Sequence, residues 1–574
     1  MPKTTLSDLL VSYLEMLEVE FVFCVPGSAL NPFFEALGRS ERRGKIKLVL
    51  SRHENGAAYM ADGYARETGK LGVCCATTGP GATNFITGIS AAYSEHIPVL
   101  AITPQTLIKD FSFGTFQDSS SDGYDIIRMF DKCTYYNTLI THSNQFEKKL
   151  TSALTVALSS SKGPAHLSIP AEIFSAPFDA PPTYGNLKNL ISEQDLIVDK
   201  ISLDNLITSI THTISDNKSI AMHVDFRCHE AGNLIMKFAE IVNAEIVTTP
   251  TGKKSINPYH PLYKGVFGFS GHSSAREVME NQNLGLIISV ASDMNEWGTC
   301  RWDTSLLNEK LVHIDDKISN FRQSPMAKTH ILGNFKSVFS YLVNCLEQNK
   351  PFLKQSKINS CSQYSDRSHI SEYIPKNIKI RNSINGLTIN PNELVKPPIL
   401  IQKIVEKFPK CTRYYIDNSN SIPWTIHHMF LEQYQNYNIS INFAPMGWAI
   451  GAAAGSGFGN KNVPTVCFTG DGCFLMSVTE LSVIAEHNLP IVIVLLKDKL
   501  YGMIKQSHDL KGCDRANFSI PETDFCLLAE SLGANSIKVT NLEDLEQINF
   551  DKIKMPTLIE VLIDPNEKAP LGMC

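Results

Sequence analysis

Short apolar runs that alternate with segments of helical periodicity are the feature that most constrains the fold of this chain. In the first block these runs lie at 21–25, 47–50, 71–76, 99–103 and 163–170. A helical pattern at 54–68 separates the second run from the third. Buried parallel strands are typically continuous apolar runs, and a helical crossover usually joins them. The pattern therefore predicts a doubly wound α/β domain over residues 1–178.

Two further blocks repeat this rhythm. Expected strands at 219–224, 244–249, 286–291 and 310–314 indicate a central α/β domain over 195–345. Expected strands at 414–417, 463–469, 491–496 and 558–563, with a helix at 478–487, indicate a third domain over 396–574. Residues 351–391 are rich in Ser, Asn, Lys and Gln and have little periodicity, as expected of a surface linker. We therefore expect an α/β fold of three doubly wound domains with parallel sheets.

The composition argues against several classes of protein. The formal net charge is only -6, and Lys and Arg are scattered along the chain, so no nucleic-acid partner is expected. No stretch approaches the roughly 18 to 20 apolar residues of a membrane span. The 14 Cys include no CxxC pair, which argues against a zinc site and a disulfide framework. We expect a cytoplasmic protein with no membrane partner.

Two acidic residues follow neighbouring expected strands of the third block. Gly470, Asp471 and Gly472 come directly after the run 463–469, and Asp498 follows the run 491–496. A glycine turn at a helix N-terminus can hold a phosphate, and magnesium is commonly bound by one or two carboxylates together with phosphates. An ordinary loop turn would also explain the glycine motif taken alone. The second Asp favours a magnesium and diphosphate site.

Three turns of the first block also follow strands. Gly27 lies in the turn 24–28, Glu54 begins the helical pattern at 54–68, and Pro80 and Asn84 lie in the glycine-rich turn 77–84. Glu54 taken alone would be an ordinary first-turn residue of a helix, where the dipole favours an acid. Each of the three turns also resembles a turn of one enzyme family, and three such matches in one domain are hard to assign to chance.

Together these motifs resemble the thiamine-diphosphate-dependent enzymes, specifically the acetolactate synthase-like (large catalytic subunit) branch. The resemblance covers nearly the whole chain. In that family a paired Asn follows the acidic glycine turn, and its second member binds the metal; here Lys497 and Asp498 stand in its place. The resemblance implies a Mg²⁺ ion held by Asp471, Asp498 and the backbone carbonyl of Leu500.

The same resemblance assigns the cofactor residues. Glu54 would be the catalytic acid that bonds the aminopyrimidine N1′ and favours the imino tautomer, which removes the weakly acidic C2 proton of thiamine. The implied thiamine diphosphate contacts are Gly27, Glu54, Pro80, Asn84, Asn420, Ser421, Ala444, Met446, Gly472 and Cys473. Within the segment 442–451, the Ala444 carbonyl and Met446 amide would bond ring nitrogens, and the Met446 side chain would lie between the two rings. From the residue type alone, Met446 would be core filling.

The substrate side matches the family less closely. The loop 114–118 resembles the synthase loop that borders the substrate, so Gln117 is a candidate catalytic residue, with an exposed loop Gln as the alternative. This loop has no His-His pair of the pyruvate decarboxylase kind. Gly502-Met503 is followed by 504–507 without the tryptophan of the anabolic synthases. The segments 222–225 and 291–297 lack the glycine cluster and Arg-Phe-Asp-Asp-Arg-like run of flavin-binding members, so no FAD is expected.

The resemblance favours a carboligase that acts on pyruvate or a related 2-oxo acid, removes carbon dioxide and transfers the resulting enamine to a second carbonyl compound. The alternative is a 2-oxo acid decarboxylase or an acyloin-forming carboligase for a bulkier 2-oxo acid or a sugar acceptor. A protein that binds the cofactor without catalysis is a third hypothesis, against which Glu54 argues. The family also implies a homodimer or homotetramer with active sites between subunits.

Overall fold

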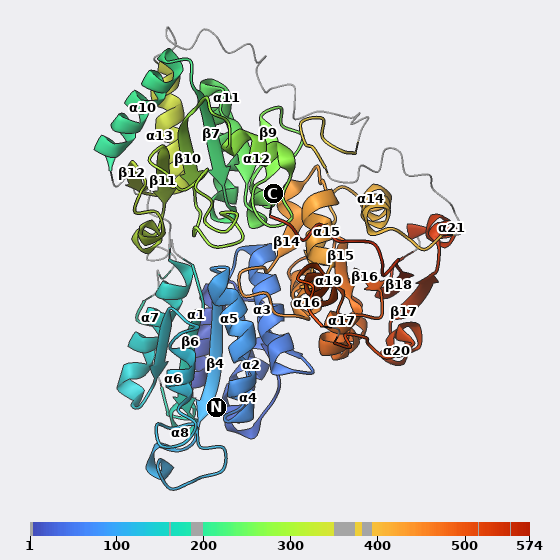
Figure 1. Ribbon diagram of the computed structural model, residues 1–574. Coiled ribbons are helices and arrows are strands. Elements are labelled where there is room, and N and C mark those ends of the chain that lie inside the picture. The colour runs from blue at the N-terminus through green and yellow to red at the C-terminus, as the bar shows by residue number, and fades with distance from the viewer. Residues whose placement is uncertain are drawn as a thin grey trace.

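The structure is a computed structural model, which describes residues 4–159, 162–178, 180–184, 187, 199–348, 373–380, 393–514, 516–550 and 553–573. Within these ranges the strands of three six-stranded sheets pair in parallel throughout. Helices cover both faces of each sheet (Figure 1). The predicted fold class, three α/β domains with parallel sheets, is confirmed.

The first sheet has the strand order β2-β1-β3-β4-β6-β5. Its strands are β1 (Phe21–Cys24), β2 (Lys47–Leu50), β3 (Gly72–Cys75), β4 (Val99–Gln105), β5 (Tyr136–Leu139) and β6 (Ala165–Pro170). Its helices are α1 (Leu6–Met16), α2 (Asn31–Arg42), α3 (Glu54–Thr68), α4 (Pro80–Asn84), α5 (Ile86–Ser94), α6 (Ile126–Phe130), α7 (Phe146–Leu158) and α8 (Ala171–Phe174). Successive residues of β3 face opposite sides, so Cys74 belongs to one buried cluster while Val73 and Cys75 belong to the other.

The central sheet has the order β12-β11-β10-β7-β8-β9. Its strands are β7 (Ser219–Val224), β8 (Glu245–Thr248), β9 (Tyr263–Val266), β10 (Leu284–Val290), β11 (Leu311–Asp315) and β12 (Thr329–Leu332). Its helices are α10 (Lys200–Ser215), α11 (Gly232–Val242), α12 (Ser273–Met279) and α13 (Phe335–Gln348). The strand order reverses between β7 and β10, so a crevice opens at their carboxyl ends.

The third sheet has the order β14-β13-β15-β16-β18-β17, which is the order of the first sheet. Its strands are β13 (Arg413–Ile416), β14 (Tyr437–Ile439), β15 (Thr465–Gly470), β16 (Ile491–Lys497), β17 (Asn535–Val539) and β18 (Thr557–Leu562). Its helices are α14 (Pro397–Lys407), α15 (Ser421–His428), α16 (Trp448–Gly459), α17 (Asp471–Ser477), α18 (Leu481–Glu486), α19 (Gly502–Leu510), α20 (Phe525–Ser531) and α21 (Leu542–Gln547).

Helices α3 and α16 join the first domain to the third and lie side by side (Figure 1). A Cβ atom on Gly63 would lie 1.9 Å from the Ala452 carbonyl oxygen, and one on Gly455 would lie 1.9 Å from the Met60 carbonyl oxygen. Because glycine has no Cβ atom, the backbones of the two helices can come into direct contact at these positions. One buried cluster, which includes Tyr64 and Ala453, continues from one domain into the other.

Two details differ from the sequence-based expectations. The predicted helix at 478–487 is a 3₁₀ turn, Val478–Glu480, followed by the short helix α18. Most of the expected linker at 351–391 lies outside the described residues, but 373–380 packs on the central domain, where the Tyr259 hydroxyl donates to the Tyr373 carbonyl at 3.0 Å. In the described part of the chain, every helix is too short or too polar to span a membrane.

Candidate active site

The two predicted metal ligands lie at one edge of the third sheet. β15 and β16 pair in parallel up to Gly470 and Leu496, so Asp471 and Asp498 emerge side by side at the carboxyl ends of the strands. Asp471 Oδ2 accepts from the backbone N–H of Lys499 at 2.8 Å, and Asp498 Oδ1 accepts from the N–H of Leu500 at 3.0 Å. Both carboxylates line the same cavity.

The charges in this cavity favour a cation. Burial, together with the nearby charge of Asp498, raises the pKa of Asp471 to about 7, and burial raises the pKa of Asp498 to about 6. Two carboxylates that share a buried site repel each other, and a divalent cation between them would remove that repulsion. Hard oxygen donors of this kind suit Mg²⁺.

Other predicted residues complete the cavity. Asn420, Ser421, Met446, Gly472, Cys473 and Leu500 all line it together with the two Asp residues. Asn420 is the residue before α15, and its Oδ1 atom is buried without a hydrogen-bond partner among the described residues. An added Cβ on Gly502 would lie 2.4 Å from Asp498 Oδ2, so glycine permits the close approach of this loop. The unpaired Asn420 oxygen marks a position where a further polar group would be stabilised.

The predicted ring-contact segment has an unusual backbone. Ala444 has a φ of 57° and Gly447 a φ of 85°, so the chain turns sharply before α16 begins at Trp448. The N–H of Gly447 donates to Asp417 Oδ1 at 2.9 Å, and Asn418 Nδ2 donates to the Pro445 carbonyl at 2.9 Å. Ala444 is exposed and Met446 is half-buried. The fixed turn therefore holds Ala444 at the surface, in a left-handed backbone conformation.

The predicted residues of the first domain also come together, at the carboxyl edge of its own sheet. Glu54 begins α3 and its Oε2 accepts from Asn84 Nδ2 at 2.9 Å. Pro80 is the first residue of α4, directly before the Gly81 turn that packs on Glu54. An added Cβ on Gly27 would lie 2.3 Å from the Thr77 Cβ, so the turn at Gly27 lies against the same region.

Gln117 lies in the long loop that follows β4. The Thr78 hydroxyl donates to the Gln117 carbonyl at 2.9 Å, which ties this residue to the glycine-rich turn. The loop extends from the bottom of the first domain (Figure 1), and Phe113 and Phe116 are more than four-fifths exposed. Gln117 therefore lies beside the Glu54 edge, next to an apolar loop that has little packing within the chain.

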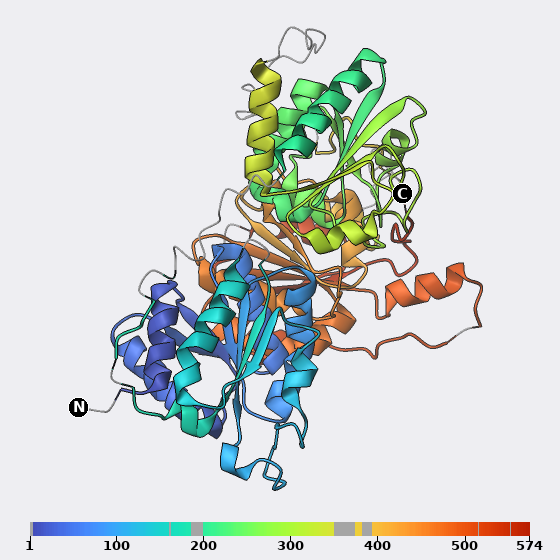
Figure 2. The same cartoon turned by 90° about the vertical axis from the view of Figure 1, so that its left-hand side faces the viewer.

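Glu54 and Gln117 are not among the described residues that line the acidic cavity of the same chain. Among the described residues, the cavity that holds Asp471 and Asp498 is lined by third-domain residues alone. Beside it, α19 stands away from the rest of the domain (Figure 2), and none of its residues is buried. Glu54 and Gln117 form one half of a candidate site, and the acidic cavity forms another.

A network of charged side chains lies at the carboxyl edge of the central sheet, beside a cavity that Arg227, Asp316 and Lys317 line. Arg227 is buried and donates to Asp315, with Nη2 to Oδ2 at 2.6 Å, and to Asp293 Oδ1 at 3.1 Å. Its guanidinium also contacts Asp316. The Asp225 carboxylate accepts from the hydroxyls of Thr249 and Thr251. The carboxyl ends of β7, β10 and β11 are thus joined by ion pairs and hydrogen bonds.

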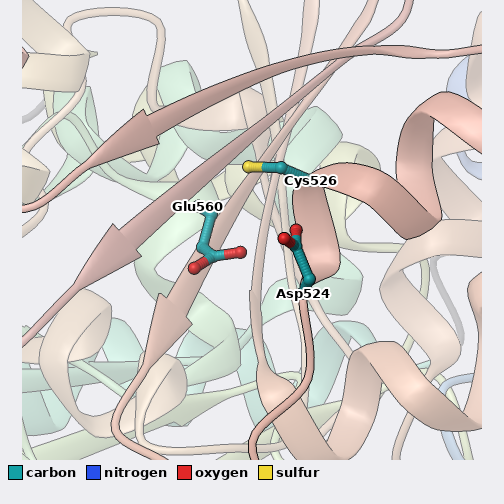
Figure 3. Close-up of side chains that lie close together, drawn as sticks. All are labelled: Asp524, Cys526 and Glu560. Carbon is teal, nitrogen blue, oxygen red and sulfur yellow. The ribbon is translucent and has the colours of Figure 1, made fainter.

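A second acidic cluster lies in the third domain. Asp524, Cys526 and Glu560 point toward one another from the start of α20 and from β18 (Figure 3). Lys497 Nζ donates to Glu560 Oε1 at 3.0 Å, and Asp524 Oδ1 caps α20 by accepting from the Leu527 N–H at 2.9 Å. The cluster is therefore accounted for by an ion pair and a helix cap.

Sequence reasoning missed several residues of the site. Tyr501, Met503, Ile504 and Ile563 line the acidic cavity, although they belong to no predicted contact. Met503 and Ile504 lie in the stretch 502–507, which resembles the synthases in part, so the sequence carried a signal for them. Tyr501 precedes it and Ile563 follows a buried strand, and nothing in the sequence distinguishes either from a core residue.

Three family models match the chain. They are the thiamine pyrophosphate enzyme N-terminal TPP binding domain at residues 4–126, the central domain at 207–342 and the C-terminal TPP binding domain at 417–561. Among similar proteins, a probable acetolactate synthase large subunit of Methanococcus aeolicus is 28% identical and covers 98% of this chain and 92% of its own length. The acetolactate synthase isozyme 2 large subunit of Escherichia coli is 26% identical, over 96% of this chain and 94% of its own. The chloroplastic acetolactate synthase 1 of Nicotiana tabacum is 27% identical, over 99% and 83%.

Proposed function

Because the chain belongs to the thiamine pyrophosphate enzyme family and its relatives are named acetolactate synthases, we propose that it is a thiamine-diphosphate-dependent carboligase that acts on pyruvate or a related 2-oxo acid. One observation carries the proposal. The two outer sheets present complementary chemistry at their carboxyl edges, with Glu54 and Asn84 on one and Asp471 and Asp498 on the other.

The third domain would hold the diphosphate and Mg²⁺. Asp471, Asp498 and the Leu500 carbonyl would bind the cation, and the turn at Gly472 and Cys473 would face the phosphates at the start of α17. The buried, unpaired Asn420 Oδ1 and the raised pKa values of the two Asp residues support this fit. Asp498 in place of the family's Asn keeps an oxygen donor at the same strand end.

The first domain would hold the aminopyrimidine ring. When bound, thiamine diphosphate supplies a carbon nucleophile that attacks the keto carbon of the substrate. Glu54 would hold the proton that it shares with a ring nitrogen, and Asn84 orients the Glu54 carboxylate. The Ala444 carbonyl and Met446 N–H would orient the ring from the other side. Gln117 would contact the substrate beside them.

We propose that the active unit is a homodimer or a larger homo-oligomer with each site between two subunits. The acidic cavity of one chain is lined by described residues of its third domain alone, and Glu54 lies outside it. A partner subunit that supplied Glu54, Asn84 and Gln117 would complete the site. The symmetric pairing would build two equal sites per dimer.

We also propose that the chain holds no flavin and that its domains span 1–178, 195–345 and 396–574, with 351–391 as a linker. The segments 222–225 and 291–297 lack the glycine cluster and the Arg-Phe-Asp-Asp-Arg-like run of flavin-binding family members, which supports the absence of flavin. Purified protein should therefore show no flavin absorption band, and a stoichiometric band would contradict this assignment.

The function is tested by incubating the protein with thiamine diphosphate, Mg²⁺ and a panel of 2-oxo acids and identifying the products by mass spectrometry. Acetolactate or another acyloin is expected, whereas aldehyde release alone would contradict the carboligase. Mixing Glu54→Gln chains with Asp471→Ala chains under subunit exchange tests the shared site. Activity should return, because one interface of the heterodimer combines an intact Glu54 with an intact Asp471. Exchange without recovery would mean that each chain builds a complete site.

A further inference from the structure

Two buried glutamates reach across the contact between the first and third domains of one chain. Glu95 follows α5 in the first domain, and Glu480 ends the 3₁₀ turn before α18 in the third. Each side chain is 1% exposed. Each carboxylate accepts hydrogen bonds from two consecutive backbone N–H groups of the opposite domain. The two interactions are reciprocal.

Glu95 holds the segment that leads to the ring contacts of the third domain. Its Oε1 atom accepts from the N–H of Ile441 at 3.1 Å and from the N–H of Asn442 at 3.0 Å. Ala444, with its left-handed backbone, follows two residues later. Asp417 and Asn418 fix the other end of the turn, so Glu95 supplies the anchor on the side where the strand β14 ends.

Glu480 holds the residues directly before Glu54. Its Oε1 atom accepts from the N–H of His53 at 2.9 Å and from the N–H of Arg52 at 3.1 Å. An added Cβ on Gly56 would lie 2.1 Å from this oxygen, so glycine is required for the glutamate to reach the helix N-terminus. The start of α3, and with it Glu54, is therefore anchored by the third domain of its own chain.

The placement of these bonds is more specific than domain adhesion requires. Hydrogen bonds that served only to stabilise the domain contact could be formed at any position where α3 packs on α16. Both glutamates instead end on the two short segments that precede Glu54 and Ala444, the groups proposed to bind opposite sides of the aminopyrimidine ring. Backbone N–H groups that donate to a buried acceptor have little freedom, because breaking such a bond leaves a buried polar group without a partner.

We infer that Glu95 and Glu480 are positioning residues, each of which holds the ring-binding segment of the opposite domain in the same chain. The inference rests on the proposed function and deepens it. Glu95 supports the half-site that contains Asp471, and Glu480 supports the half-site that contains Glu54. If sites form between subunits, each site depends on the Glu95 of one chain and on the Glu480 of the other.

The first test separates ring binding from diphosphate binding. Glu95→Ala should weaken binding of thiamine diphosphate by about tenfold or more, because an anchored backbone is lost, while Mg²⁺-dependent binding of inorganic pyrophosphate stays unchanged. Glu95→Gln should restore binding, since its amide oxygen can accept the same two N–H groups. Glu95 would be only a structural residue if Glu95→Ala weakened the binding of thiamine diphosphate and of pyrophosphate equally. The same would follow if a folded Glu95→Gln variant did not bind thiamine diphosphate.

The second test uses subunit exchange between two weakened variants. Glu95→Ala chains keep an intact Glu54 half-site, and Glu480→Ala chains keep an intact Asp471 half-site. Their heterodimer therefore contains one site with both halves intact, and it should be more active than either parent. By the same reasoning Glu95→Ala should complement Glu54→Gln but not Asp471→Ala. The opposite pattern, or no recovery in any pairing, would overturn the assignment of each glutamate to its half-site.

The mixture of Glu54→Gln and Asp471→Ala chains is the control that separates the two proposals. If that mixture recovers activity and the glutamate pair does not, the shared site stands and the positioning role fails. If that mixture does not recover, the shared site fails, and the comparison of thiamine diphosphate with pyrophosphate decides the role of Glu95. Should the Ala variants unfold, the Gln variants test the role by themselves: a positioning role requires that they bind thiamine diphosphate as the parent does, and weaker binding in a folded Gln variant would overturn it.

Discussion

The side-chain amide of Asn84 donates a 2.9 Å hydrogen bond to Oε2 of Glu54. This bond orients the Glu54 carboxylate within the first domain. Since Asn84 lies in α4 and Glu54 in α3, the glycine-rich turn before α4 sets the direction of the carboxylate.

Glu54→Gln should nearly abolish C2 proton exchange of bound thiamine diphosphate, with a loss of about 100-fold or more, because the amide cannot share the proton that sets the ring tautomer. The fold should persist, since the amide oxygen of the substituted side chain would still accept from Asn84. Exchange is measured by proton NMR after transfer to deuterated buffer, and the thermal midpoint checks folding. Exchange at the parental rate would remove Glu54 from the mechanism.

Asp498→Ala should weaken Mg²⁺-dependent cofactor binding by at least about tenfold, the smallest loss typical of disturbed metal sites. Asp498→Asn should retain most of the affinity, because an amide oxygen can bind the cation and accept from the Leu500 N–H. Calorimetric titration with thiamine diphosphate at several Mg²⁺ concentrations compares the two. Equal affinity of the parent and Asp498→Ala would place the cation elsewhere.

The stability of the cofactor-free protein should fall as the pH rises from about 5 to about 8. Burial raises the pKa of both Glu95 and Glu480 from an ordinary value of 4.5 to about 7. Between these values the folded chain binds protons that the unfolded chain has lost, so raising the pH favours unfolding, by up to roughly 3 kcal/mol for each group. Thermal midpoints across this range measure the slope.

The double variant Glu95→Gln with Glu480→Gln is the matched control for this pH dependence. It keeps acceptor oxygens at both positions but has no charge to bury, so its midpoint should vary less with pH than that of the parent. A parental slope in the double variant would assign the dependence to other groups.

Gly455→Ala should destabilise the protein by about 1–3 kcal/mol or more, because the new Cβ would lie 1.9 Å from the Met60 carbonyl oxygen and would force α16 away from α3. Gly38→Ala in α2 is the matched control. The nearest atom to its Cβ, Arg42 Nη1, is 3.7 Å away, so this substitution should stabilise the helix by about 0.5–1 kcal/mol. Thermal midpoints of the two variants should therefore move in opposite directions.

The interior of each sheet could be predicted from the sequence, whereas most edge strands could not. The range 219–224 coincides with the interior strand β7, and 47–50 coincides with β2, the one edge strand that was predicted. The five strands that were not predicted, β5, β9, β12, β14 and β17, all lie at sheet edges. They have three to five residues each and include polar residues such as Asn137 and Lys538, because an edge strand needs no continuous apolar run.

Site residues could be predicted where a motif directly follows a strand. They could not be predicted where a hydrogen bond joins residues that are far apart in the sequence. Asp471 and Asp498 could be predicted to lie close together, because each follows a strand and parallel strands end at the same edge of the sheet. Glu95 lies 346 residues from Ile441 and Glu480 lies 427 residues from His53, and no local pattern marks either pair. Only the packing of α3 on α16 brings each glutamate to its partners.

The identical strand order of the two outer sheets has an evolutionary consequence. A gene duplication would produce two copies of one scaffold. The two ends of the cofactor differ in charge, so the two copies can bind opposite ends only if the loops at their sheet edges differ in sequence. On the same strand order, the loops of the third domain carry Asp471 and Asp498, and those of the first carry Glu54 and Asn84. Selection for a new substrate can thus act on the loop after β4 and on the segment that begins at Tyr501, without disturbing either core.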